Sequence, residues 1–251
     1  TERAAISQQK IISNKTDEKR KEKLMVLVHN PATTANLMDT VMALRTPKSR
    51  TETVGLHITI NGEHANKYMQ SGKSELEHAA SIAAAADMPF TIHNRLGNNI
   101  VDSIKHASEE YEATDLIMGL ADIRNVTRKY YEDFILSVTA KNRQQTFFVR
   151  MNIPVNMIRR IVVIIPEQFT LSPGFLKSME YIGRLGTSIG CSTHFYGNES
   201  TLNDVRSYGK SASRTEYYPI SDTNDLGWIM DNVNKDHRSE ERRVGKECDL
   251  M

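Results

Sequence analysis

The most constraining feature of the sequence is a short, continuously apolar run near its beginning, Leu24-Met25-Val26-Leu27-Val28. A run without polar alternation predicts a strand buried on both faces, as in a parallel sheet that is covered by helices on both sides. The run stops at His29-Asn30-Pro31, and Thr33 or Thr34 can then cap a helix with apolar residues at helical spacing. The first part of the chain therefore predicts a strand–turn–helix unit of the α/β class.

The same alternation of strand-like and helix-like segments continues to about residue 151. Further strands are predicted at Val54–Ile60, Phe90–His93, Asp115–Leu120 and Thr146–Met151. Helices are predicted between them at Ser74–Ala86, at Ile100–Tyr111 and from Phe134–Thr139 onward. Strands that alternate with helices indicate βαβ units, and hence a parallel sheet with right-handed crossovers.

The pattern restarts after Pro154, which indicates a second copy of the same architecture. A strand at Ile161–Pro166 and another at Cys191–Tyr196 each begin 137 residues after their counterparts in the first half. The other predicted elements of this copy are a helix at Phe175–Leu185, a strand at Glu216–Ile220 and a helix at Leu226–Val233. The fourth strand would fall near residues 242–247, where the chain is highly charged. The sequence therefore predicts two doubly wound parallel-sheet α/β domains, the second truncated and with a shorter insertion after its second strand.

These patterns divide the chain into four predicted parts. Residues 1–22 are polar and form a predicted linker, followed by a first domain over 23–153 and a truncated second domain over 154–237. The charged residues 238–251 break the pattern and are predicted to be a non-native tail. The chain starts at Thr1 rather than methionine, which fits either a processed start or a piece cut from a longer protein.

Composition argues against several classes of protein. Lys and Arg number 32 against 31 Asp and Glu, so the basic excess of a nucleic-acid-binding protein is missing. Two cysteines are too few for a disulfide framework and indicate a reducing compartment. No apolar run approaches the roughly 20 residues that span a bilayer, and the polar N-terminus lacks a signal peptide. The composition predicts a soluble intracellular protein.

Candidate ligand-binding residues follow from the predicted sheet. In open α/β sheets, ligands bind beyond the carboxyl ends of the strands. The candidates at the strand ends are His29, Asn30, His93 and Gly119, and His57 within the second predicted strand joins them. Three histidines at neighbouring strand ends could form a metal or acid–base site, or could hydrogen-bond locally. No HxH or HExxH spacing links them, so the sequence predicts neither a metal nor a cofactor.

The sequence also predicts that this protein is not an enzyme. There is no G-x-S-x-G nucleophile motif, and no paired carboxylates stand at the strand ends. Cys191 opens a buried strand, where cysteine behaves as a small apolar residue. After Gly119 no second glycine follows to let backbone N–H groups cradle a phosphate, and Asp122 would repel one.

The order of elements and the strand Asp115-Leu116-Ile117-Met118-Gly119 resemble the universal stress protein domain. Nucleotide-binding members of that family continue with G-x-x-G, nine residues and then G-[ST]. Here those positions hold Gly119, Asp122, Glu132 and Asp133, so only the first matches. The acidic residue usual at the first strand end is replaced by the pair His29-Asn30. The resemblance implies the fold and a phosphate loop that has been lost.

Three segments resemble more narrowly the cytosolic tails of bacterial monovalent cation/proton (Na⁺/H⁺ or K⁺/H⁺) antiporters: Val28–Pro31, Leu116–Leu120 and Arg159–Pro166. Those tails carry tandem, degenerate stress-protein domains after the membrane domain. The resemblance implies a non-catalytic regulatory or structural module on the cytoplasmic side of the inner membrane. Its implied partners are the transport domain of the same polypeptide, a nucleotide or other small-molecule effector, and a second copy in a homodimer, with no nucleic acid.

Two other hypotheses remain open from the sequence. The first is a stand-alone tandem universal stress protein that binds an adenine nucleotide, and the second is an enzyme of unknown type, because folds of this class host many activities. Histidines at the strand ends would let cytosolic pH bias a conformational equilibrium. The alternative is that they only fill polar strand ends.

Overall fold

The computed structural model of the chain describes residues 22–45, 51–120, 128–150, 153–208, 214–225 and 227–231. The predicted tail at 238–251 and all of the predicted linker except Glu22 lie outside these residues. The chain divides into two compact units, one reaching to Ile158 and including Glu180–Ile189, the other comprising Arg159–Met179 and the residues from Gly190 on. None of the described helices is both long enough and apolar enough to cross a membrane.

The first unit is built on a five-stranded parallel sheet with the order β3-β2-β1-β4-β5. Its strands are β1 (Lys23–Leu27), β2 (Glu52–Ile60), β3 (Phe90–Gly97), β4 (Asp115–Gly119) and β5 (Gln145–Val149). Its helices are α2 (Pro31–Leu44), α3 (Ala65–Ala85), α4 (Ile100–Glu110) and α5 (Arg128–Lys141). The predicted doubly wound parallel architecture is confirmed.

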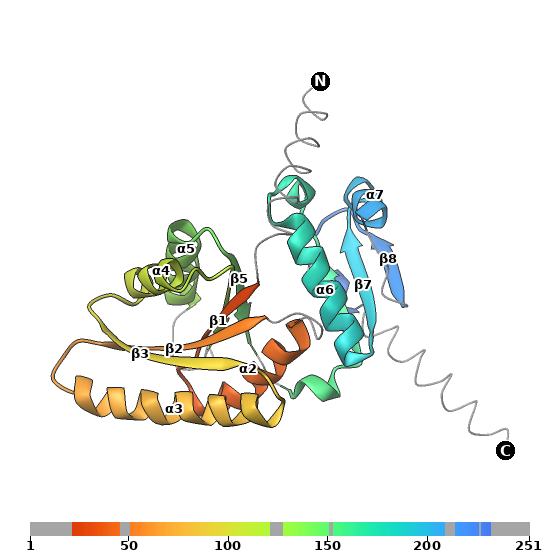
Figure 1. Cartoon of the computed structure of the whole chain (residues 1–251). Helices are drawn as coiled ribbons and strands as arrows, with labels where there is room; N and C mark the ends of the chain where they lie inside the picture. Colours follow the sequence, from red (N-terminus) through yellow and green to blue (C-terminus); the bar gives the residue numbers. More distant parts are fainter. Residues whose placement is uncertain are drawn as a thin grey trace, which may run out of the picture. The chain divides into compact units, whose positions relative to one another are not determined.

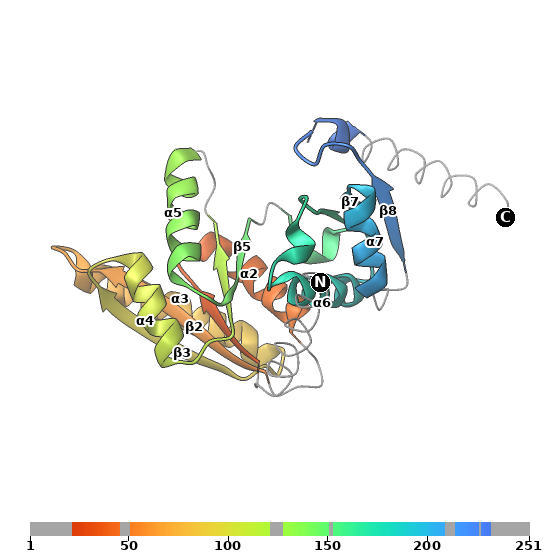
Figure 2. The same cartoon turned by 90° about the horizontal axis from the view of Figure 1, so that it is seen from above.

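Helices cover both faces of this sheet, α2 and α3 on one and α4 and α5 on the other (Figures 1 and 2). Successive side chains of a strand point to opposite faces, so a central strand needs apolar residues in an unbroken run. β1 meets this need. Leu24 and Val26 pack toward α2 and α3, Met25 packs toward α4 and α5, and all three are 0% exposed.

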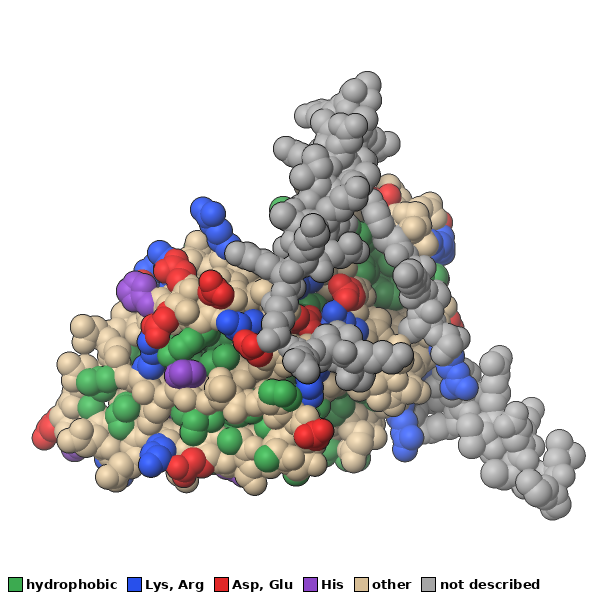
Figure 3. Space-filling view, viewed as in Figure 1, with side chains coloured by type: hydrophobic (Ala, Val, Ile, Leu, Met, Phe, Trp, Pro, Cys, Tyr) green, Lys and Arg blue, Asp and Glu red, His purple; other side chains and the backbone are tan. Residues whose placement is uncertain are grey.

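α3 and β3 are both longer than the sequence predicts. α3 begins at Ala65 rather than Ser74, and a polar first half concealed its start. β3 continues past His93 because each residue up to Gly97 pairs in register with β2. β3 is an edge of the sheet, and Ile92 and Leu96 on it are exposed. Figure 3 shows hydrophobic side chains among polar ones along β3 and α3.

The second unit contains a three-stranded parallel sheet with the order β6-β7-β8. Its elements are β6 (Arg160–Ile164), η3 (Phe169–Leu171), β7 (Ser192–Gly197), α7 (Glu199–Tyr208) and β8 (Thr215–Pro219). A further 3₁₀ turn, η2 (Val155–Met157), precedes β6 and belongs to the first unit. Among the described strands, β6 pairs only with β7, and no described strand corresponds to β4 or β5.

The repeat is less regular in structure than in sequence. Leu24 of β1 pairs with Thr53 of β2, and Ile161 of β6, its counterpart, pairs with Thr193 of β7. The first strands of the two copies are therefore 137 residues apart, and the second strands 140, three more than the sequence predicts. α7 has 10 residues where α3 has 21, which is the shorter insertion that the sequence predicts. The second copy therefore keeps the strand order and shortens the helix between its second and third strands.

Helix α6 (Phe175–Ile189) contributes to both units, since its residues from Glu180 on belong to the first. The Tyr181 ring is 1% exposed, and it meets Phe147 of β5 edge-on with ring centroids 4.8 Å apart. The Tyr181 hydroxyl donates to the Glu22 carboxylate at 2.8 Å, and burial is the largest cause of its raised pKa. The sequence assigns this helix to the second domain and gives no sign of these contacts.

Candidate functional site

The carboxyl ends of β1, β2 and β4 meet at one edge of the first sheet, because β1 is paired in parallel with both neighbours. Four of the five predicted site residues lie at this edge. His29 and Asn30 follow β1, His57 lies on β2 beyond the residue that pairs with Leu27, and Gly119 ends β4. The fifth, His93, lies elsewhere.

His57 is the most buried of the candidates, with 6% of its surface exposed. Its Nδ1 lies 2.8 Å from the Val28 carbonyl oxygen and donates to it, which leaves Nε2 as the basic nitrogen of the neutral ring. The ring stacks on His29, with centroids 5.6 Å apart and 26° between the planes. Burial is the main cause that lowers the pKa of His57, so the ring is neutral at pH 7.

Asn30 has a structural role at the start of α2. Its side-chain oxygen accepts from the Ala32 amide at 3.0 Å, which makes Asn30 the N-cap of α2, with Pro31 in the first turn. The predicted cap at Thr33 or Thr34 is therefore wrong by three or four residues. Their hydroxyls donate instead to the Asn30 carbonyl at 3.1 and 3.0 Å, as helical threonines commonly do toward the preceding turn.

The structure separates His93 from the other histidines. His93 lies within β3 rather than at its end, and it pairs in register with Leu56, which packs toward α4. His57, the next residue of β2, points to the opposite face. His93 stacks on Tyr111, with centroids 4.1 Å apart. The predicted convergence of three histidines is wrong because β3 is longer than predicted and its alternation turns His93 toward the α4 face.

Gly119 is exposed and lies beside the start of α2. A Cβ placed on it would be 3.7 Å from Leu37 and 3.9 Å from the Thr33 hydroxyl, which are ordinary contact distances. Asp122, in the expected position of a second loop glycine, lies outside the described residues. Glu132 and Asp133 are exposed in the first half of α5, so the carboxylates that replace the family's last glycine pair face solvent.

Sequence reasoning missed two residues of α3 that contact the site. A Cβ on Gly72 would lie 2.2 Å from Cδ2 and 2.5 Å from Nε2 of His57, so only glycine fits there. The Glu75 carboxylate lies 3.4 Å from the Thr34 hydroxyl and joins α3 to α2. Gly72 precedes the predicted helix and Glu75 lies in its first turn, so the late predicted start of the helix hid the contact between Gly72 and His57.

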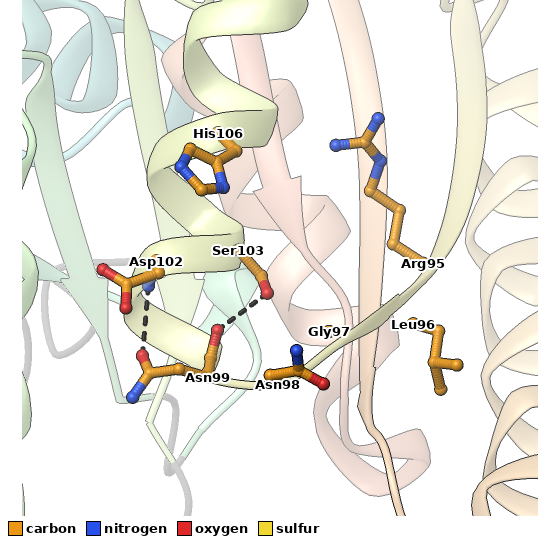
Figure 4. Close-up of a pocket in the computed structure, with 8 residues that line it drawn as sticks. All are labelled: Arg95, Leu96, Gly97, Asn98, Asn99, Asp102, Ser103 and His106. Carbon is orange, nitrogen blue, oxygen red and sulfur yellow. Dashed lines mark hydrogen bonds between the residues drawn. The ribbon is translucent and has the colours of Figure 1, made fainter.

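A separate hollow of about 550 Å³ lies at the carboxyl end of β3, beside the start of α4 (Figure 4). Arg95 and Leu96 reach it from β3, and Ser103 and His106 from α4. Its polar groups are used locally. Asn99 caps α4 by accepting from the Val101 and Asp102 amides at 2.9 and 3.1 Å, and Ser103 donates to the Asn99 carbonyl.

Other polar groups around this hollow are paired as well. Arg95 bonds to Glu110 and lies over the Tyr111 ring, and Asp102 is bonded to Lys141 at 2.6 Å. A smaller hollow of about 190 Å³ lies near the amino ends of the strands and is lined by His93 and Tyr111 among others. Ser103 and His106 both line the larger hollow, but the Ser103 hydroxyl donates to the Asn99 carbonyl at 2.7 Å rather than to His106.

Metal and thiol chemistry find little support in the described ranges. No three His, Cys, Asp or Glu side chains there gather as a metal ion would require. Cys191 is a free thiol, and burial raises its pKa, which lowers its thiolate fraction at neutral pH. The arrangement at the strand ends can bind or exchange a proton at His57, and it holds two helices in place.

The fold defines a class: the chain has the α/β fold of the universal stress proteins. A universal stress protein from Archaeoglobus fulgidus DSM 4304 matches with a TM-score of 0.51 and 14% identity, over 78% of this chain and 77% of that one. No family model matches the sequence, and no curated protein matches it.

Shorter matches cover about half of this chain. A universal stress protein from Archaeoglobus fulgidus in complex with dAMP matches with a TM-score of 0.41 and 15% identity, over 51% of this chain and 96% of that one. A universal stress protein in complex with cAMP matches with a TM-score of 0.42 and 13% identity, over 51% and 96%. At these identities, the likeness concerns the fold.

Proposed function

We propose that this chain is a non-catalytic regulatory or structural module of a bacterial cation:proton antiporter, on the cytoplasmic side of the inner membrane. The transport domain is a partner in the same polypeptide and lies outside this chain. One observation carries the proposal: the polar groups at the strand ends hold the fold together. Asn30 caps α2, and His57 donates to the Val28 carbonyl. Such a site favours a role in contacts and conformation over chemistry.

A module of this kind alters transport only if it interacts differently with two states of the membrane domain. A small-molecule effector could shift that balance at the edge formed by His29, His57 and Gly119. The proposal also includes a homodimer and excludes nucleic acid as a partner. Light scattering of the purified chain at micromolar concentration checks the dimer, and a monomer there would remove it from the proposal.

The deciding experiment uses the full-length protein. The gene upstream of Thr1 is first read for hydrophobic spans, and ion-driven proton exchange is then measured in vesicles with and without the module. We expect exchange to persist without the module, with a changed rate or pH profile. If removal changes neither of these nor the assembly of the protein, the regulatory proposal fails.

A second candidate is a stand-alone tandem stress protein that binds an adenine nucleotide. The exposed Gly119, with only ordinary contacts around its missing Cβ, favours it, since a backbone there is open to a ligand. The acidic, exposed Glu132 and Asp133 disfavour a phosphate. Calorimetry with ATP and Mg²⁺, and then with cAMP and dAMP, separates the candidates. We expect at most weak binding, and low-micromolar affinity would favour the second candidate.

A further inference from the structure

We propose that α3 is a proton-responsive flap, whose first half (residues 65–75) stays closed on the sheet only while His57 is neutral. The inference deepens the proposed regulatory function by naming the element that moves and the group that moves it. Its purpose in regulation rests on that function, but the motion itself is a property of this chain.

The backbone of α3 at Gly72 packs directly against the His57 ring. A Cβ on Gly72 would lie 2.5 Å from Nε2, so this nitrogen faces the α3 backbone at close range. The other nitrogen, Nδ1, already donates to the Val28 carbonyl at 2.8 Å. A proton taken up by His57 must therefore bind Nε2, on the side that α3 covers. His57 is only 6% exposed, so the charged ring is poorly solvated while α3 is closed, and it gains water when this part of α3 moves away.

The two halves of α3 are held to the sheet by different forces. Leu76, Ala79 and Ala83 in the second half are 0% exposed and pack into the apolar core. The first half instead covers His57 and Asn94, whose side-chain amide donates to the Met69 carbonyl at 2.6 Å. Apolar burial supplies most of the stability of a packed helix, so the first half is the more weakly held.

Buried polar atoms without hydrogen-bond partners further weaken the packing of the first half of α3 on the sheet. In the described part of the chain, the side-chain oxygen of Asn94 is buried without a hydrogen-bond partner, and so is the hydroxyl of Thr59 on the same face of β2. A buried polar atom without a partner destabilises the closed state, because it has given up its hydrogen bonds to water. Opening the first half of α3 would give both atoms access to water.

The charged and titratable groups around His57 set the direction of the response. His29, after β1, stacks on the ring, and Glu75 comes from α3 itself. α2 contributes the uncharged Thr34, and β3 the uncharged Asn94. Burial lowers the pKa of His57 most, His29 lowers it further, and the Val28 carbonyl and Glu75 oppose both.

The sign of the pH dependence follows from this lowered pKa. The ordinary histidine value is 6.5, so above that pH the closed and open states both hold neutral His57 and the closure is fully stable. Below pH 6.5, His57 becomes protonated in the open state but stays neutral in the closed state, where its pKa is lower. Closure is lost progressively as pH falls from 6.5 to the lowered pKa, and levels off below it.

Hydrogen–deuterium exchange of the whole chain at pH 7.5, 6.5 and 5.5, corrected for intrinsic rates, tests the proposal. We expect amides of residues 65–75 to lose protection by up to about tenfold per pH unit below 6.5. Residues 76–85 and helix α4 should keep theirs. Unchanged protection of residues 65–75, or an equal loss in α4, would overturn the proposal.

A matched pair of variants assigns the effect to one histidine. His57→Asn keeps a donor for the Val28 carbonyl and cannot titrate, so it should abolish the pH dependence. His93→Asn, on the opposite face of the sheet, should leave it intact. Should His57→Asn not fold, an NMR titration of the wild-type imidazoles decides: a His57 pKa at or above 6.5 overturns the proposal. A pH-responsive α3 without any effect on transport would count against the regulatory function alone.

Discussion

Arg184 and Glu22 lie 162 residues apart in the sequence, and their side chains meet at 2.6 Å in the first unit. Their side chains are 21% and 16% exposed. Arg184 also donates to the Leu44 carbonyl at 3.3 Å, and the second oxygen of Glu22 accepts from the Thr51 hydroxyl at 3.0 Å. A largely buried charge pair thus ties α6 to the amino-terminal ends of the strands.

Replacing Arg184 by methionine should destabilise the first unit, because the Glu22 carboxylate, 16% exposed, is left largely buried without its cation. We expect a loss of about 2–3 kcal/mol in the free energy of unfolding, toward the low end for buried pairs. Arg206 is the matched control: it also pairs with a glutamate and lies over a tyrosine, but it is 41% exposed. Arg206→Met should change stability by less than about 1 kcal/mol. Urea unfolding followed by circular dichroism measures both, and equal losses would contradict the role of Arg184.

Gly72→Ala should destabilise the chain, although alanine favours helices. The new Cβ would overlap the His57 ring, and such overpacking costs about 1–3 kcal/mol. Gly183 in α6 is the control, because nothing lies within 4 Å of a Cβ placed there. Gly183→Ala should raise stability by about 0.5–1 kcal/mol. Thermal unfolding compares the two variants, and a stabilising Gly72→Ala would show that the contact with His57 is loose.

Asn30→Ala should lower the free energy of unfolding by about 1 kcal/mol, because the first turn of α2 loses its cap. Asn30→Ser should keep most of that stability, since a serine hydroxyl can accept the same amide. Asn99→Ala at the start of α4 provides a second capping site for comparison. Chemical denaturation measures all three. If Asn30→Ala leaves stability unchanged, the residue is free to serve a ligand instead.

Native Cys191 should react slowly with iodoacetamide at pH 7.5. Burial raises the pKa of its thiol, and only the thiolate is the nucleophile. Mass spectrometry of the Cys191 peptide gives its rate in native and urea-unfolded protein separately from that of Cys248. We expect the native rate to be lower by several-fold at least. A native rate equal to or above the unfolded one would mark Cys191 as a reactive thiol.

The sequence was most informative for the first strand and for the residues that follow it. The run from Leu24 to Val28 predicted a strand buried on both faces of the sheet, and the turn after it predicted His29 and Asn30 at the carboxyl edge. Gly119 followed from the same rule about parallel strand ends, whereas His57 was named from within the predicted strand Val54–Ile60. The rule failed for His93, because the polar residues after it gave no sign that β3 continues to Gly97 along the sheet edge.

Contacts between distant segments could not be predicted in this way. Nothing in the spacing of Glu22 or Arg184 indicates their partner, since a charge pair of this kind has no periodic pattern. Gly72 gave no usable signal, because the helix was predicted to begin only at Ser74. Its partner His57 became visible only once the register of β2 and the start of α3 were known.

Helix α6 restricts where chains of this architecture can exchange segments by recombination. The repeat in the sequence places a natural breakpoint between Val149 and Arg160, where one copy ends and the next begins. A crossover there would bring in an α6 that evolved against a different first unit, and would part Arg184 from Glu22. A viable chimaera must therefore inherit both residues from one parent, or place its junction beyond Ile189.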